Sequence, residues 1–210
     1  MGCDRLERNA VTNIKRREAV RLLVAASGAA AFAWSPEEAT RAHSALRTVR
    51  HASGGFEPRF FTPHEWATVR LLVDIIIPRD HRSGSATDAG VGEFMDFMML
   101  DGDNEDRQTA MRGGLAWLDI ECRERFAADF IDCSEEERRA VLDDIAWPAQ
   151  ARAELSHGVQ FFNSFRNLTA SGFWSSKMGV MDLQYMGNTA LPEWTGCPDE
   201  QLRKLGLLGS

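Results

Sequence analysis

A helix-start signal followed by helical spacing of apolar residues constrains this chain most strongly. Thr62 and Glu65 match the capping box, in which each side chain binds a backbone N–H at the start of a helix. Pro63 fits the first helical position, whereas Pro78 disfavours helix at Ile77 and predicts the end of the helix there. The apolar residues between these signals recur on one face: Trp66, Val69, Val73 and Ile76.

The same kind of pattern continues along most of the chain. We expect a polar loop over 79–88, then a helix capped by Asp88, and then a helix over about 107–130. Ser134 and Glu137 form a second capping box, which predicts another helix. Pro148 separates that helix from a last one over about 149–168. Gly113-Gly114 predicts a close packing contact or a kink in the longest of these helices. No strand pattern of useful length appears, so the predicted fold class is all-α, an irregular bundle of about five or six helices.

The C-terminal segment differs from this bundle. From Gly172 onward, Gly, Asn, Pro and Trp dominate, and helical periodicity fades after about Leu183. Trp174, Tyr185 and Trp194 are large aromatic residues in this irregular tail. Because aromatic residues are enriched at interface centres, the tail covers either its own core or a partner, and the sequence leaves both alternatives open.

The N-terminal segment looks like an export signal. Residues 1–33 contain six basic and three acidic residues, and Arg16-Arg17 precedes a mild Ala/Gly-rich apolar run that ends at Ala31-Phe32-Ala33. Paired arginines before such a run are typical of twin-arginine signals, although Lys15 stands where Ser or Thr is usual. The alternative is a retained amphipathic helix. We therefore divide the chain into a signal segment (1–33), a polar linker with a short helix (34–59) and a helical domain (60–210).

Composition excludes some classes of function. The 210-residue chain has a net charge of −7, which argues against a nucleic-acid-binding surface. No apolar run reaches the roughly 18 residues that a membrane-spanning helix needs. The four cysteines, Cys3, Cys122, Cys133 and Cys197, match no zinc or redox spacing. They are either buried reduced thiols or, if the signal is removed, an odd set with one thiol left for a partner.

Few residues suggest chemistry. Glu154 and His157 have the Glu-x-x-His spacing of di-iron bundles, but such a site needs a second motif and two more glutamates. We expect His64 and His81 to be solvent-exposed or capping groups. The acidic loop over 101–106 lacks the spacing of a calcium loop. Phosphate loops, dinucleotide fingerprints and haem-attachment motifs are absent, so we assign no catalytic, cofactor-binding or metal-binding residue in this chain.

Several short motifs together resemble a known family. They are Phe61-Thr62-Pro63, Ile76-Ile77-Pro78 with Asp80, Thr87-Asp88-Ala89-Gly90-Val91, Asp182-Leu183-Gln184-Tyr185-Met186-Gly187-Asn188 and Trp194-Thr195-Gly196-Cys197-Pro198. The ordered set, over roughly residues 60 to 200, is similar to the gluconate 2-dehydrogenase subunit 3 family, the small accessory subunits of flavin-dependent sugar and polyol dehydrogenases.

The resemblance implies that another chain carries the chemistry. That partner would be a large FAD-dependent flavoprotein of the glucose-methanol-choline (GMC) type, and a cytochrome c subunit with haem often accompanies it. The small subunit is expected to support folding of the flavoprotein and its export to the periplasm through the twin-arginine system. If the N-terminal segment is a retained helix instead, the protein stays in the cytoplasm. The other functional hypothesis is an independent helical metal-dependent oxidase that uses Glu154 and His157.

We expect the partner surface to combine two parts of the chain. The first is the stretch around 79–91 and the second is the aromatic tail. The motifs shared with the family concentrate in both parts, and an irregular tail needs a second surface to satisfy its backbone polar groups. The expected interface residues are Arg79, Asp80, Asp88, Val91, Tyr185, Asn188, Trp194 and Cys197.

Overall fold

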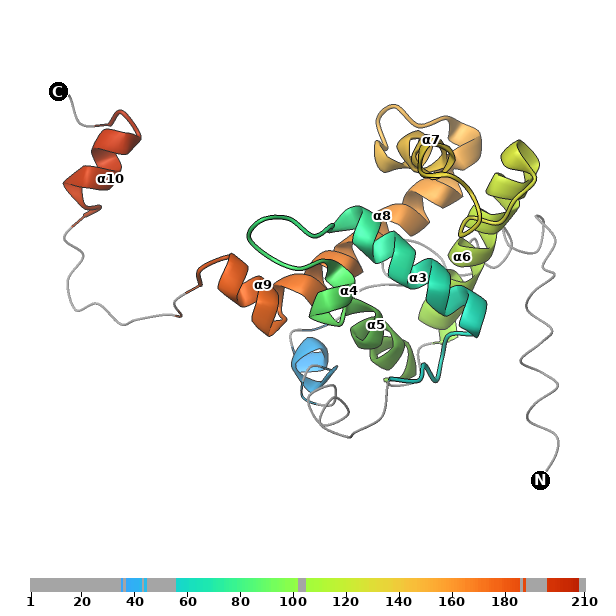
Figure 1. The fold of residues 1–210 in the computed structure, drawn as a ribbon, viewed down its shortest axis with the longest axis horizontal. Coiled ribbons are helices and arrows are strands. Elements are labelled where there is room, and N and C mark those ends of the chain that lie inside the picture. The colour runs from blue at the N-terminus through green and yellow to red at the C-terminus, as the bar shows by residue number, and fades with distance from the viewer. Residues whose placement is uncertain are drawn as a thin grey trace.

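The structure is a helical bundle. This computed structural model describes residues 35, 37–42, 44, 56–101, 105–185, 187 and 196–207, and within these ranges no strand occurs (Figure 1). The named elements are α3 (Pro63–Ile76), α4 (Ala86–Ala89), α5 (Val91–Leu100), α6 (Glu105–Phe126), α7 (Glu135–Ala146), the 3₁₀ turn η4 (Ala153–Leu155), α8 (Ser156–Trp174), α9 (Lys177–Asp182) and α10 (Asp199–Lys204). The predicted all-α class is confirmed.

Both capping boxes form as predicted. Thr62 and Glu65 exchange side-chain and backbone hydrogen bonds at the start of α3, and Ser134 and Glu137 do the same at the start of α7. Helix α3 ends at Ile76, and Ile77 is its C-cap, because Pro78 disfavours helical geometry at the residue before it. These helix boundaries depend on local chemistry alone, which explains why the sequence was sufficient to place them.

The predicted start of the next helix at Asp88 is wrong. Ser85 is the N-cap of the short helix α4, and Asp88 is the third residue of its capping box. Gly90, with φ of 84°, then separates α4 from α5. A left-handed residue ends one helix and lets the chain turn into the next, so two helices replace the single expected one.

Two other helix boundaries also differ from the prediction. Helix α6 ends at Phe126, because Ala127 has φ of 59° and turns the chain. Phe130, expected inside the helix, instead lies in the following turn with its side chain fully buried. Beyond Pro148, a turn and η4 come first, so α8 begins at Ser156 rather than near residue 149 and continues to Trp174.

Helix α8 is the centre of the bundle. It packs against α5, α6 and α7, and Figure 1 shows α7 and α9 toward its opposite ends. A Cβ atom added to Gly114 of α6 would lie 1.8 Å from the Phe161 ring of α8, and one added to Gly158 of α8 would lie 2.5 Å from the Trp117 ring of α6. The predicted close contact at Gly113-Gly114 is therefore confirmed.

The segment before the bundle contains a short helix, as expected. Residues 37–42 are helical, and Ala42 is fully buried in the same core as the later helices. Glu38 also lies near Arg107 of α6, with 3.9 Å between Oε1 and Nη2. This part of the 34–59 segment therefore packs on the bundle.

The two ends of the chain are only partly described. The signal segment with Arg16 and Arg17, together with Asn188 and Trp194 of the tail, lies outside the described residues. In the described tail, α10 has no buried residue. Among the described residues, no helix combines the length and the apolar character needed to cross a membrane.

We predict that Gly114→Ala destabilises the protein, although a Gly→Ala change in an open helix gains about 1 kcal/mol. The new methyl group would overlap the Phe161 ring, and overpacking of this kind costs about 1–3 kcal/mol. Urea unfolding followed by circular dichroism measures the change. Adding Phe161→Leu should make the Gly114→Ala loss smaller than it is in the wild-type background; an equal loss in both backgrounds would contradict the contact.

Candidate functional site

A charged pocket lies where the start of α3, the middle of α6 and the segment between α6 and α7 meet. Its cavity volume is about 130 Å³. The pocket is lined by Thr62, His64, Glu65, Thr68, Arg112, Leu115, Ala116, Asp119, Arg123 and Asp129. Most of these side chains can carry a charge, so their pairing decides what the pocket can bind.

One side of the pocket is formed by the ion pair between Arg112 and Glu65. Arg112 Nη1 lies 3.0 Å from both carboxylate oxygens of Glu65, and its Nη2 donates to the carbonyl of Phe60 at 2.7 Å. The guanidinium also lies over the Phe60 ring, 4.4 Å from its centroid. Glu65 therefore caps α3 and holds α6 at the same time, with its side chain only 9% exposed.

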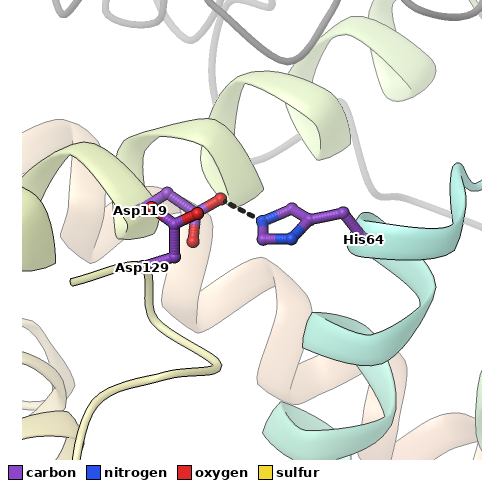
Figure 2. Close-up of side chains that lie close together, drawn as sticks. All are labelled: His64, Asp119 and Asp129. Atoms are coloured by element: carbon purple, nitrogen blue, oxygen red, sulfur yellow. Dashed lines mark hydrogen bonds and ion pairs between the residues drawn. The ribbon is translucent and has the colours of Figure 1, made fainter.

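The other side gathers an imidazole and two carboxylates. His64 Nε2 lies 2.7 Å from Asp119 Oδ2, and the other oxygen of Asp119 accepts the backbone N–H of Phe130 at 3.0 Å. Asp129 pairs with Arg123. Figure 2 shows the side chains of His64, Asp119 and Asp129 converging from α3, α6 and the following segment.

The structure corrects our expectation for His64. Its side chain is 27% exposed and paired with a buried carboxylate, so it is neither a free solvent group nor a cap. His64 and Asp119 are 55 residues apart in sequence, a separation at which helical periodicity carries no pairing signal. His81, in contrast, is exposed, as predicted.

This group has the composition of a metal site. One ligand atom from each of His64, Asp119 and Asp129 can be chosen so that all lie within 4.8 Å of one another. Among the described residues, no group of three metal-ligating side chains includes Glu154 or His157. Glu154 is exposed on η4, whereas His157 is half-buried in the first turn of α8. The geometry therefore does not support the oxidase hypothesis built on Glu154 and His157.

A separate, larger groove lies between the 82–89 segment and α9. Its volume is about 700 Å³, and it is lined by Arg82, Ser83, Gly84, Asp88, Ala89, Lys177, Met178, Met181, Asp182 and Gln184. Arg82 joins the two walls, with its Nε 3.1 Å from Asp182 Oδ1 and its Nη2 donating to the Asp182 carbonyl. Two of the motifs quoted above, far apart in sequence, thus lie side by side.

The predicted interface residues of the 79–91 stretch fall into two groups, those at the surface and one in the core. Arg79 is exposed and pairs with Asp88 at 2.5 Å. Asp80 is exposed and accepts the backbone N–H groups of Ser83 and Arg82, which lower the pKa of its carboxyl. Val91, however, is fully buried in the core, so its inclusion in a surface was wrong. It is the first residue of α5, and its apolar side chain packs inward.

The predicted interface residues of the tail are exposed where the structure describes them. Tyr185 is 59% exposed, and it follows the exposed side chains of Met181 and Leu183. Cys197 is exposed and free. Asn188 and Trp194 lie outside the described residues, so their assignment stays a sequence-based prediction.

The other two cysteines that the structure describes are core residues. Cys122 and Cys133 are buried and free. Desolvation raises the pKa of both thiols, and their proximity raises that of Cys122 further. They therefore follow the first alternative stated above, that of small apolar core residues.

These features define the class of the protein: an all-α domain with a charged pocket formed by α3, α6 and the segment after α6, and a groove between the 82–89 segment and α9. The family model of gluconate 2-dehydrogenase subunit 3 matches residues 63–192, more than half of the chain. The chain belongs to the gluconate 2-dehydrogenase subunit 3 family, as the resemblance predicted. Neither the curated proteins nor the solved structures gave a match. The matched range includes the whole groove and every lining residue of the pocket except Thr62.

We predict that Arg112→Met lowers the free energy of unfolding by about 3 kcal/mol, because it leaves the buried Glu65 carboxylate unpaired. Adding Glu65→Gln should recover part of this loss, since glutamine keeps the capping bond without the charge. Chemical denaturation measures both variants. The matched control is Arg139→Met, which breaks an exposed pair with Glu135 and should cost less than about 0.5 kcal/mol. Equal losses at Arg112 and Arg139 would contradict this assignment.

Proposed function

We propose that this chain is the non-catalytic small subunit of a heteromeric dehydrogenase, and that it binds and stabilises a large FAD-dependent subunit of the GMC type. The large subunit would oxidise a sugar, a sugar acid or a polyol, and a cytochrome c subunit with haem would take the electrons where one is present. Membership of the subunit 3 family is the observation that carries the proposal. The cofactors are assigned to the partners and not to this chain.

The groove supports a docking role for this chain. Its walls combine charged side chains, Arg82 and Lys177, with the apolar side chains Met178 and Met181. Interfaces commonly join an apolar centre to a polar rim, and Met and Arg are enriched in them. Because both walls belong to the range that the family model matches, the flavoprotein subunit is the occupant we propose.

Exposed apolar side chains next to the groove support the same surface. Met181, Leu183 and Tyr185 are 67%, 56% and 59% exposed. Such residues close together on a soluble domain favour contact with another protein. The interface we propose therefore comprises the groove and these three residues, which belong to α9 and the residues after it. Arg79, Asp80 and Asp88 contribute to the same interface from the opposite wall of the groove, near the 82–89 segment. Asn188, Trp194 and Cys197 extend it along the tail on the strength of the sequence.

Co-expression of this chain with a GMC-type flavoprotein subunit from the same organism tests the proposal. We expect a complex whose flavin absorbance and sugar-oxidising activity are absent from the isolated small chain. The double variant Met181→Asp/Leu183→Asp should weaken the complex by about thirtyfold or more, equivalent to about 2 kcal/mol, because two charges would enter the apolar part of the interface.

The control for that experiment is Trp147→Asp, which places one such charge on another exposed apolar residue, at the end of α7. It should leave binding unchanged. Circular dichroism of each variant alone checks that the helical core is intact. Normal complex formation by the double variant would remove the groove from the interface, whereas failure of the wild-type chains to associate would overturn the proposed function itself.

We further propose that the complex is exported to the periplasm on the twin-arginine signal of this chain. Replacing Arg16 and Arg17 with Lys should leave both subunits in the cytoplasm, because that export system requires the paired arginines and carries folded, cofactor-loaded proteins. Cell fractionation with a flavoprotein assay measures the distribution. Unchanged periplasmic activity would favour the alternative of a retained N-terminal helix.

A further inference from the structure

We propose that His64, Asp119 and Asp129 bind one divalent metal ion of the Zn²⁺ type. The ion would join the start of α3 to α6 and to the segment that precedes α7. The proposal concerns this chain alone and does not depend on its role as a subunit. It rests on geometry, on the hydrogen bonds behind the ligands and on charge balance.

The ligand atoms are close enough to share an ion. They lie within 4.8 Å of one another, and His64 Nε2 is already 2.7 Å from Asp119 Oδ2. Zinc binds nitrogen and carboxylate oxygen at about 2.0–2.2 Å, so two ligand atoms on one tetrahedral ion lie about 3.5 Å apart. Small side-chain rotations therefore reach this geometry from the arrangement that Figure 2 shows.

The buried ligand is held in place from behind. The Phe130 N–H fixes one oxygen of Asp119, and the other oxygen points toward His64. Hydrogen bonds of this kind orient metal ligands and tune their affinity. The side chain of Asp119 is 9% exposed, which limits the alternative positions it can adopt. When an ion takes the place of the proton on His64 Nε2, the neutral ring carries its proton on Nδ1.

Charge in the pocket favours a cation. Glu65 and Arg112 neutralise each other, which leaves Asp119 and Asp129 facing Arg123 and the imidazole of His64. Two carboxylates therefore face one permanent cation. Arg123 competes for Asp129, but its side chain is 43% exposed and can turn into solvent. A divalent ion would then balance both carboxylates.

The ligand types and the space in the pocket select the kind of ion. One imidazole with two carboxylates suits Zn²⁺ or Mn²⁺, whereas Mg²⁺ and Ca²⁺ prefer oxygen ligands alone. The cavity of about 130 Å³ has room for water molecules, which would complete the coordination. Three protein ligands plus water is the open arrangement that zinc adopts outside closed structural sites.

Isothermal titration of the untagged, chelator-treated full chain with ZnCl₂ tests the proposal. We expect one Zn²⁺ per chain and a much weaker response to MgCl₂. His64→Gln and Asp129→Asn should each weaken Zn²⁺ binding at least about tenfold, because each removes a ligand. The matched control is His81→Gln, which removes an exposed histidine of the 79–88 loop and should leave binding unchanged.

Arg123→Gln separates a metal site from a purely structural cluster. It removes the cation that competes for Asp129, so Zn²⁺ should bind more tightly than to the wild type. Wild-type protein that takes up no stoichiometric Zn²⁺, or binding that His64→Gln, Asp129→Asn and Arg123→Gln all leave unchanged, would overturn the proposal. Circular dichroism checks folding. If His64→Gln does not fold, Asp129→Asn decides the outcome, because that side chain is on the pocket rim and 28% exposed.

Discussion

The close approach of α6 and α8 is the constraint on which the rest of the bundle depends. Phe161 of α8 lies against Gly114 of α6, and Trp117 of α6 lies against Gly158 of α8. Each helix thus supplies one aromatic ring and one glycine, which lets the two backbones come close while large apolar surfaces are buried. Because α5 and α7 also pack on α8, this contact sets the frame that positions both sites.

Buried carboxylates then fasten the non-helical segments to that frame. Asp96 of α5 accepts the backbone N–H groups of three successive residues, Arg59 to Phe61, just before α3. Asp119 of α6 accepts the backbone N–H of Phe130, which follows α6. Glu65, at the start of α3, accepts from the guanidinium of Arg112 in α6. The bonds to Asp96 and Asp119 satisfy backbone N–H groups that lie outside the helices. They also bring the ends of three elements together, which creates the charged pocket.

The two sites lie in different parts of the fold and suit different partners. The pocket is small, charged and formed by side chains that pair with one another, a setting suited to an ion. The groove is larger and mixes apolar with charged residues, a setting suited to a protein. The pocket thus joins elements of this chain to one another, whereas the groove is the surface that we propose for a partner subunit.

The sequence by itself determined what depends on near neighbours. The capping boxes at Thr62 and Ser134, the stop at Pro78 and the helical periodicity fixed the fold class and several helix boundaries, because the interacting groups are three or four residues apart. The ordered motifs also identified the family. At Asp88 the sequence pattern predicted the wrong cap, because Ser85, three residues earlier, is the N-cap in the structure.

Only the tertiary structure decided which distant residues meet. His64 and Asp119, or Arg82 and Asp182, are separated by 55 and 100 residues, and no periodic pattern pairs them. Burial followed the same rule. Val91 and Arg79 belong to one stretch of sequence, yet packing against the other helices turns Val91 into the core and leaves Arg79 at the surface. Which side of a short segment faces inward is set by the partners that cover it, and those partners come from elsewhere in the chain.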